Sequence, residues 1–306
     1  TVGPDNQQRG VSTAADAPTR QHLVTRQARE EFDVGRYSVR KPGASFFDVA
    51  ARRQTVRTTQ NPQLQAAAEG ARHATTCAEL KALPVLDAPI TLPPLTVPDR
   101  VVELAREPLR TFAQTASRLA GRHVATTGKQ ARAVARCLTE ALARWADANR
   151  ENTLRVGQAA PGALIELQKT LSSVTLAYSI VDATASEMVP KQAERVEAWL
   201  AEASRAQLDW PLGGSSCCDS IYYLRSLHAT AAGVVANDDQ LLQQGVRALR
   251  TALAEMRPDG SLPRERAHGH RAFALQFNGT GYLVMIGRLL ERQGYDVSSI
   301  RSDGAA

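Results

Sequence analysis

Apolar residues recur every three or four positions along most of the chain beyond residue 98, which is the spacing of one face of an α-helix. The clearest case is the stretch 162–182, whose apolar face comprises Leu164, Leu167, Leu171, Val174, Tyr178 and Val181. The same spacing predicts helices over about 99–120, 128–149, 162–182, 190–206, 217–235, 238–256 and 269–292. No segment of this region alternates apolar and polar residues as a half-buried strand does, so we predict an all-α domain.

Residues that favour helix ends lie near the predicted boundaries. Pro161 and Pro190 stand near helix starts, where the missing proline N–H costs nothing. The sequence Asn-Asp-Asp at 237–239 offers an N-cap, and Pro-Asp-Gly at 258–260 is typical of a turn. Helices joined by such short loops must pair antiparallel. A plain bundle and a curved toroid of hairpins, whose loops surround a cleft, both satisfy this requirement.

The chain before residue 99 has a different amino-acid composition. Residues 1–60 are rich in Arg, Gln, Thr, Ser and Asp, and such a composition buries too little apolar surface to offset chain entropy. In the sequence LPVLDAPITLPPLTVPDR, prolines alternate with apolar residues, which favours an extended strap over a helix. We therefore predict a disordered or extended segment at 1–98 with a Pro-rich strap, a helical domain at 99–296 and a flexible tail at 297–306.

The composition agrees with helix packing, because apolar residues make up 43% of the chain and aromatic residues only 5%. The net charge of +6 is carried almost entirely by arginine, which binds carboxylates and phosphates through paired hydrogen bonds. A polyanionic substrate, nucleic acid and a base-composition bias of the genome would each account for this charge. The chain has no P-loop, no Rossmann glycine run, no RNP-type aromatic pair and no strongly basic helix stripe, so nucleic-acid binding is disfavoured.

The sequence offers little that would suit a metal, a cofactor or a membrane. The four cysteines, whose pairing stays open, include no CxxC pair, which argues against a zinc or thioredoxin-type site. His268 and His270 have no third ligand nearby, and we expect neither a metal nor an organic cofactor. No apolar run reaches the roughly 18 residues of a membrane span. The chain begins at Thr1, which allows for a removed leader, and we expect a periplasmic or secreted protein.

Several stretches of the helical region resemble a known family. They are CLTEALARWADA, AERVEAWLAEA, the helix after LDWPLGGSSCCDS, and above all the turn DGSLPRE, which is followed by RAFAL in HRAFALQFNGTGYLVMIGRLLERQGYDV. Over about residues 137–292 the chain is similar to the alginate lyase family of helical polyuronate lyases. The resemblance implies an incomplete α/α toroid of antiparallel helical hairpins. It also implies β-elimination, in which an acidic polysaccharide is cleaved next to a uronate.

One of the family's catalytic positions is retained in this chain, and three others are occupied by different residues. The family's arginine, which stabilises negative charge on the uronate carboxylate, falls on Arg271. The family's Asn-Asn-His run is replaced by GSSCCDSIYY, with the His position on Asp219 or Ile221. The family's tyrosine, seven residues after the arginine, is replaced by Asn278.

A substitute set can be drawn from the same helices. Arg271 and Asn278 are seven residues apart and share one helix face, so together they can hold a carboxylate, and Tyr282 continues that face. Asp219 is either a general base or a helix cap. Of Tyr222 and Tyr223, we expect one in the core and the other in the cleft, as a second candidate base.

Four more residues surround Arg271, namely Arg264, Arg266, His268 and His270. They form either a cationic rim that binds the carboxylates of the polymer or a solvated loop. The leading hypothesis is a monomeric polysaccharide lyase that acts on an anionic, uronate-containing polysaccharide. The alternatives are a catalytically silent glycan-binding or scaffold protein on a lyase frame, and an exported effector-like protein.

Overall fold

The structure, a computed structural model, describes residues 33–85, 99–148, 161–209 and 218–300. The described residues after Asp33 belong to one compact unit. Their elements are η1 (Val34–Arg36), α2 (Val49–Thr58), α3 (Pro62–His73), α4 (Cys77–Ala82), α5 (Asp99–Ala125), α6 (Gly128–Ala148), α7 (Pro161–Met188), α8 (Pro190–Leu208), α9 (Ser220–Ala236), α10 (Asp239–Glu255), α11 (Pro263–Arg266), η2 (Gly269–Arg271), α12 (Ala272–Arg292) and η3 (Val297–Ser299). None of these residues forms a strand.

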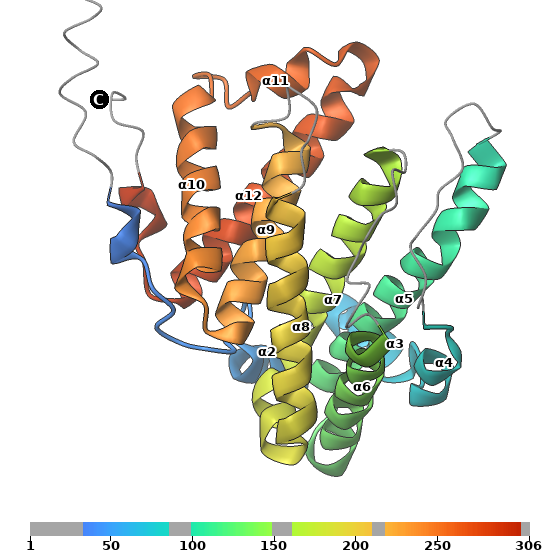
Figure 1. Cartoon of the computed structure of the whole chain (residues 1–306). Helices are drawn as coiled ribbons and strands as arrows, with labels where there is room; N and C mark the ends of the chain where they lie inside the picture. Colours follow the sequence, from blue (N-terminus) through green and yellow to red (C-terminus); the bar gives the residue numbers. More distant parts are fainter. Residues whose placement is uncertain (1–32, 86–98, 149–160, 210–217, 301–306) are drawn as a thin grey trace, which may run out of the picture. The chain divides into compact units, whose positions relative to one another are not determined.

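The seven helices predicted beyond residue 98 are confirmed as α5 to α10 and α12. They form the antiparallel hairpins of an incomplete α/α toroid (Figure 1). Pro161 and Pro190 begin α7 and α8, and Asp238 caps α10 by accepting a hydrogen bond from Leu241 N at 3.0 Å. Helix α7 is longer than predicted and ends at Met188, because its apolar face continues to Ala185, which is fully buried.

Residues 49–82, for which we predicted disorder or an extended chain, form helices α2, α3 and α4 instead. Each of these helices has a side-chain N-cap, namely Asp48, Asn61 and Thr76. Capping satisfies the orphan amides of short helices that bury little apolar surface. The Pro-rich strap and residues 1–32 lie outside the described residues, so the prediction for them, like the division into domains, is not tested.

A disulfide joins Cys77 of α4 to Cys137 of α6, with the two Cα atoms 5.8 Å apart. The pairing was open at the level of sequence, because it depends on which helices become neighbours. Lys81 and Glu140 reinforce the same contact with an ion pair of 2.7 Å. Cys218 is also part of a disulfide. The bridge to α6 fixes α4 on the helical domain although α4 buries little more than Leu80.

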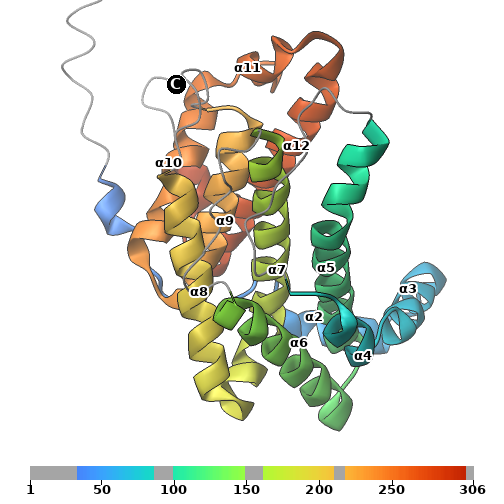
Figure 2. The ribbon, with the colours of Figure 1, turned by 45° about the vertical axis from the view of Figure 1, so that its right-hand side comes forward.

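Helix α7 lies between α5 on one side and α8 and α9 on the other (Figure 2). Its buried side chains Leu171, Val174 and Tyr178 belong to the main core. Helix α12 packs on α9 and α10, and α11 crosses its N-terminal end. Helices α9 and α10 approach closely at Gly245, where an added Cβ would lie 2.0 Å from the Thr230 hydroxyl. None of the helices described is both long and apolar enough to cross a bilayer.

The segment before α2 runs along the C-terminal end of α12. The buried Gln293 side chain accepts hydrogen bonds from Arg40 N and Lys41 N at 2.9 and 2.8 Å and donates to Lys41 O at 3.1 Å. The Tyr295 hydroxyl contacts the backbone of Ser38. The start of the predicted flexible tail is structured, because Asp296 caps η3 and Ile300 is buried. Residues 38–41 and 293–295 therefore hold each other in place by hydrogen bonds.

Candidate functional site

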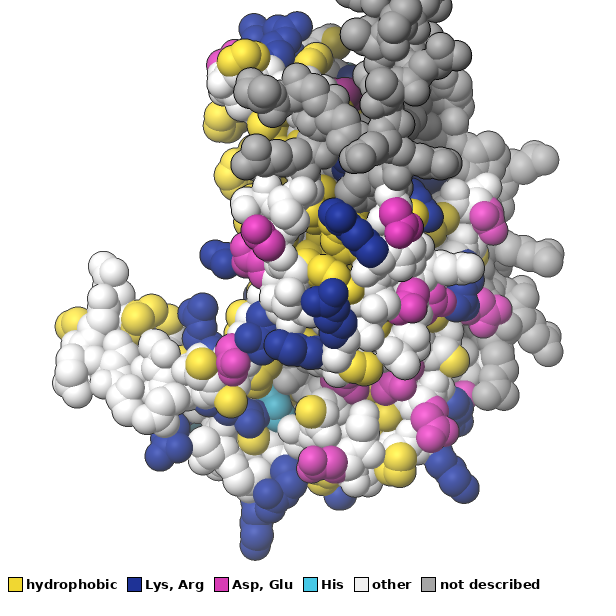
Figure 3. Space-filling view, turned by 90° about the vertical axis from the view of Figure 1, so that its left-hand side faces the viewer, with side chains coloured by type: hydrophobic (Ala, Val, Ile, Leu, Met, Phe, Trp, Pro, Cys, Tyr) yellow, Lys and Arg dark blue, Asp and Glu magenta, His cyan; other side chains and the backbone are white. Residues whose placement is uncertain are grey.

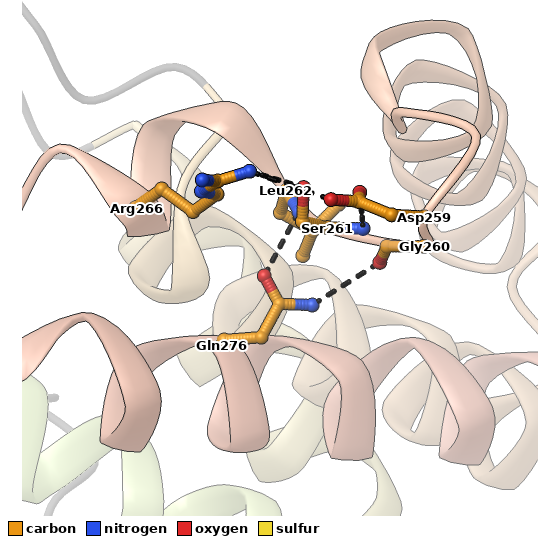
Figure 4. Close-up of polar contacts among 6 residues, drawn as sticks. All are labelled: Asp259, Gly260, Ser261, Leu262, Arg266 and Gln276. Atoms are coloured by element: carbon orange, nitrogen blue, oxygen red, sulfur yellow. Dashed lines mark hydrogen bonds and ion pairs between the residues drawn. The ribbon is translucent and has the colours of Figure 1, made fainter.

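The turn before α12 is held by hydrogen bonds that its sequence makes possible. Gly260 has a φ of +77°, a conformation that favours glycine, and the Asp259 carboxylate accepts from Ser261 N at 3.0 Å. Gln276 of α12 then clamps the turn from below (Figure 4). Its Oε1 accepts from Leu262 N at 2.8 Å, and its Nε2 donates to Gly260 O at 3.3 Å. The turn at residues 259–262 is thereby held against α12.

Helix α11 is anchored at the start of α9 by a buried acid. The Glu265 carboxylate is fully buried and accepts a hydrogen bond from Ser220 N. Burial raises the pKa of this carboxyl. Arg264 and Arg266, which flank it, are exposed but engaged in ion pairs with Glu255 at 3.0 Å and Asp259 at 3.4 Å. A substrate carboxylate would have to compete with these acids for either guanidinium.

Arg271 differs from its arginine neighbours. It precedes the first residue of α12, is exposed, and makes no side-chain hydrogen bond or ion pair with any described residue. Because Arg271, Asn278 and Tyr282 are spaced by seven and four residues, they follow one face of α12. Arg271 is therefore free to take a negatively charged ligand on that face.

That face of α12 lines a pocket of about 460 Å³ shared with α7 and α9, which we call the α7–α12 pocket. Asn278 and Tyr282 line it from α12, Lys169 from α7, and Leu224 and Leu227 form its apolar wall on α9. Burial and the charge of Glu166 raise the pKa of the Tyr282 hydroxyl, so it stays protonated at neutral pH. The pocket thus combines one cation, one amide and one phenol.

A second pocket, of about 490 Å³, adjoins the first between α5 and α7, and we call it the α5–α7 pocket. Lys169 and Ser173 line both pockets. Arg110, Arg118 and Glu166 complete the charged lining, and Arg110 lies 3.9 Å from the nearly buried Glu166 carboxylate. The two pockets together form one cleft whose charged side chains come from α5 and α7.

The three candidate bases on α9 do not line either pocket. The Asp219 carboxylate caps α9, accepting from Ile221 N at 3.0 Å and Tyr222 N at 3.1 Å, which is the structural role weighed against catalysis. The Tyr222 hydroxyl faces α10, where Gln244 donates to it at 3.3 Å, and burial raises its pKa. Tyr223 is buried, as expected for one of the pair, against Gly279 of α12.

The histidines have no common site. His268 and His270 are exposed beside α11 and η2, outside the lining of the two pockets. His228 is fully buried, its Nδ1 is 3.1 Å from the Gln207 side-chain oxygen, and burial lowers its pKa to about 3. The described residues contain no group of three or more potential metal ligands. On the face shown in Figure 3, basic side chains lie among acidic ones, so its positive charge is dispersed.

Four pocket residues were not predicted from the sequence, namely Lys169, Arg110, Arg118 and Glu166. Lys169 is the one cation in the long apolar stretch 162–182, and that contrast was the available signal. The other three could not be found without the register of α5 against α7. The sequence placed Arg271, Asn278 and Tyr282 on one face, and the structure shows that face opposite Lys169.

Comparison with known proteins shows the family to which this chain is similar. Residues 48–306 match the alginate lyase family. A polysaccharide lyase of Stenotrophomonas maltophilia (strain K279a) is 31% identical over 166 residues, which cover 54% of this chain and only 49% of that relative. The chain thus spans about half the length of the curated relative it matches.

Solved structures agree with the sequence match. The crystal structure of alginate lyase A1-III from Sphingomonas species A1 superposes with a TM-score of 0.76 at 26% identity, covering 89% of this chain and 77% of that one. A variant of alginate lyase A1-III complexed with a tetrasaccharide gives a TM-score of 0.74 at 26% identity, covering 87% and 74%. By its sequence over residues 48–306 and by its fold, the chain belongs to the alginate lyase family.

Proposed function

We propose that this protein is a polysaccharide lyase that cleaves a uronate-containing polysaccharide by β-elimination in the cleft between α5, α7 and α12. The observation that carries the proposal is the face of α12. It brings Asn278 and Tyr282 into one pocket with Lys169, and Arg271, which makes no side-chain hydrogen bond or ion pair with a described residue, directly precedes the same helix. The relative that binds a tetrasaccharide on the same fold supports a sugar ligand.

The first step of the reaction needs stabilisation of negative charge. Removal of the uronate C5 proton moves charge onto the adjacent carboxylate. A guanidinium and an amide that hold the carboxylate lower the energy of that state. Arg271 and Asn278 supply these two groups, and the Lys169 ammonium adds a second positive charge beside them.

Two further groups can move the protons. The Glu166 carboxylate lines the adjoining pocket and can accept the C5 proton. As the C4–O bond to the next sugar breaks and a C4–C5 double bond forms, the departing oxygen needs a proton. The Tyr282 hydroxyl, whose raised pKa keeps it protonated, can donate it. In this mechanism no proton passes through α9, and the roles of Asp219, Tyr222 and Tyr223 are structural.

The experiment is the ultraviolet absorbance of the unsaturated product during incubation with polymannuronate, polyguluronate or polyglucuronate. We expect the absorbance to increase with one of these polymers and Arg271→Ala to abolish the increase. The control is Arg288→Ala, which should keep the increase because Arg288 lies on α12 in a surface pair with Glu291. Glu166→Gln and Tyr282→Phe should each lower kcat about 100-fold or more. An increase that survives Arg271→Ala would refute the assigned site.

One observation favours a second function, a catalytically silent glycan-binding protein. The carboxylate of Asp219 is engaged as a helix cap, and neither Tyr222 nor Tyr223 lines the two pockets of the cleft. A flat absorbance trace on all three polymers, together with retardation of the wild type but not of Arg271→Ala in affinity electrophoresis on immobilised polyuronate, would establish this function instead.

The proposal includes an extracytoplasmic compartment. Disulfides persist in periplasmic and secreted proteins and are rare in the cytosol, and the Cys77–Cys137 bridge supports such a location. Alkylation of free thiols before and after reduction, followed by mass spectrometry of protein from the native host, tests this. Labelling of Cys77 or Cys137 without reduction would contradict it.

A further inference from the structure

A third pocket opens between α2, α3, α5 and α7, and its lining is unlike that of the other two. Its volume is about 610 Å³, and we call it the apolar pocket. Phe46, Phe47, Val124, Leu176 and Ile180 dominate the wall. Its single charged lining residue is Arg52, whose guanidinium lies 5.5 Å from the centroid of the Phe47 ring.

The apolar pocket adjoins the proposed uronate cleft. Ser173 lines all three pockets, Leu176 is shared with the α7–α12 pocket, and Ser117 is shared with the α5–α7 pocket. Helix α7 is the common wall, and its lining changes from Lys169 at one end to Ile180 at the other. Eleven residues of helix separate these two positions, which corresponds to about 16 Å.

This change of polarity along one wall is poorly suited to an unmodified polyuronate. Each sugar of such a polymer carries a carboxylate and hydroxyls, and burial of these groups against Phe46, Leu176 and Ile180 would leave them without hydrogen-bond partners. A ligand with a charged head and an apolar chain fits both halves. The volume of the apolar pocket lies within the roughly 300–1,000 Å³ of small-molecule sites.

We propose that the cleft binds a uronate glycoside that carries an acyl or alkyl chain, an anionic glycolipid in chemical terms. The uronate lies between Lys169 and the Arg271 face of α12, and the chain enters the apolar pocket along α7. This inference rests on the proposed recognition of uronates and adds the class of substituent that the natural ligand carries.

The test uses the full chain and a series of methyl, butyl and octyl β-glucuronides, with octyl β-glucoside as the uncharged control. Isothermal titration gives the dissociation constants. Each methylene moved out of water should tighten binding about fourfold, so octyl should bind at least about 100-fold more tightly than methyl glucuronide. Octyl glucoside should bind much more weakly than octyl glucuronide, because it has no carboxylate for Lys169 and Arg271.

A filled pocket provides the decisive variant. Gly121 lines the apolar pocket, and a Cβ added there would meet nothing within 4 Å. Gly121→Leu therefore introduces into the pocket a side chain whose Cβ has room, and it replaces a helical glycine by a better helix former. The matched control is Gly70→Leu on α3, where an added Cβ is equally free but the residue does not line the pocket.

We expect Gly121→Leu to bind methyl glucuronide as the wild type does and to lose the gain with chain length, while Gly70→Leu keeps it. Equal affinities across the series, an unchanged gain in Gly121→Leu, or equally tight octyl glucoside would each overturn the inference, as would no glucuronide binding. Absorbance on polyuronates is read separately. A protein that cleaves polymers but shows no chain-length effect therefore retains the proposed function and refutes only the apolar substituent.

Discussion

Replacing Asp182 by asparagine should remove a pH dependence of folding stability that this carboxyl creates. Asp182 is on α7, only 5% exposed, and accepts a hydrogen bond from Ser186 at 3.0 Å. Its other oxygen lies against Gly43, where an added Cβ would be 2.1 Å away. Burial raises the pKa of Asp182 from 3.8 to about 6. The pKa of Glu197 on α8 is raised as well, by burial and then by the charge of Asp182.

The magnitude follows from the difference between the two pKa values. Each tenfold change in proton affinity is worth about 1.4 kcal/mol, so the change from 3.8 to about 6 corresponds to about 3 kcal/mol. The folded state binds this proton more tightly than the unfolded chain. The contribution to the free energy of unfolding is therefore complete below pH 3.8 and is lost as the pH rises to about 6.

Urea denaturation between pH 4 and 7.5 measures this effect as a difference between two proteins. The wild-type curve alone is ambiguous, because burial lowers the pKa of His123 to about 4 and this histidine destabilises the fold as the pH falls. The Asp182→Asn curve keeps the histidine contribution, so the difference isolates the carboxyls. We expect the variant to gain about 2 kcal/mol relative to wild type between pH 4 and 7, because part of the full effect lies below pH 4.

The control for this experiment is Asp147→Asn, which removes an exposed carboxylate paired with Arg195 at 3.0 Å. An exposed pair contributes about 0–1 kcal/mol, so its difference curve should stay nearly flat. A difference curve for Asp182→Asn that is equally flat would refute the assignment of a buried, protonated Asp182 beneath Gly43.

Three further predictions concern stability, each measured by urea unfolding. The double change Cys77→Ser/Cys137→Ser opens a bridge between residues 60 apart and should cost about 4 kcal/mol, whereas an unchanged midpoint would contradict the bridge. Gly245→Ala should cost about 2 kcal/mol because its Cβ would meet the Thr230 hydroxyl at 2.0 Å, and a neutral result would disprove the close approach of α9 and α10. Gln276→Ala removes two hydrogen bonds to the turn and should cost about 1–2 kcal/mol, so wild-type stability would show that the clamp is dispensable.

The helical domain could be predicted because its signals are local. The apolar face of α7 can be read from the spacing of its residues alone. Pro161 and Pro190 mark helix starts because they lack a backbone N–H, and Asp238 marks one through its capping side chain. Helices α2 to α4 were not predicted because they bury few apolar side chains, so their sequences show no clear apolar face. All three begin with a side-chain N-cap, and α4 is held in addition by the Cys77–Cys137 bridge, which exists only once α4 lies on α6.

The candidate site could also be predicted only in part from the sequence. The spacing of Arg271, Asn278 and Tyr282 places them on one helix face in any fold, so this part could be predicted. The rotation of α9 about its axis could not, and it turns Tyr222 towards α10 rather than towards the cleft. Lys169 lines the site only because α7 stands opposite α12.

Charge pairing decides which cations of this arginine-rich chain can recognise a carboxylate. Arg264 donates two hydrogen bonds to Glu255, and a sugar that recruited it would first have to break both. Arg271 and Lys169 have no such partner among the described side chains, so their positive charge is available without that cost. In the binding mode that we propose, these two cations hold the uronate carboxylate between α7 and α12. In the same proposal, the apolar residues of α7 beyond Ser173, Leu176 and Ile180, set the direction in which the rest of the ligand leaves the cleft.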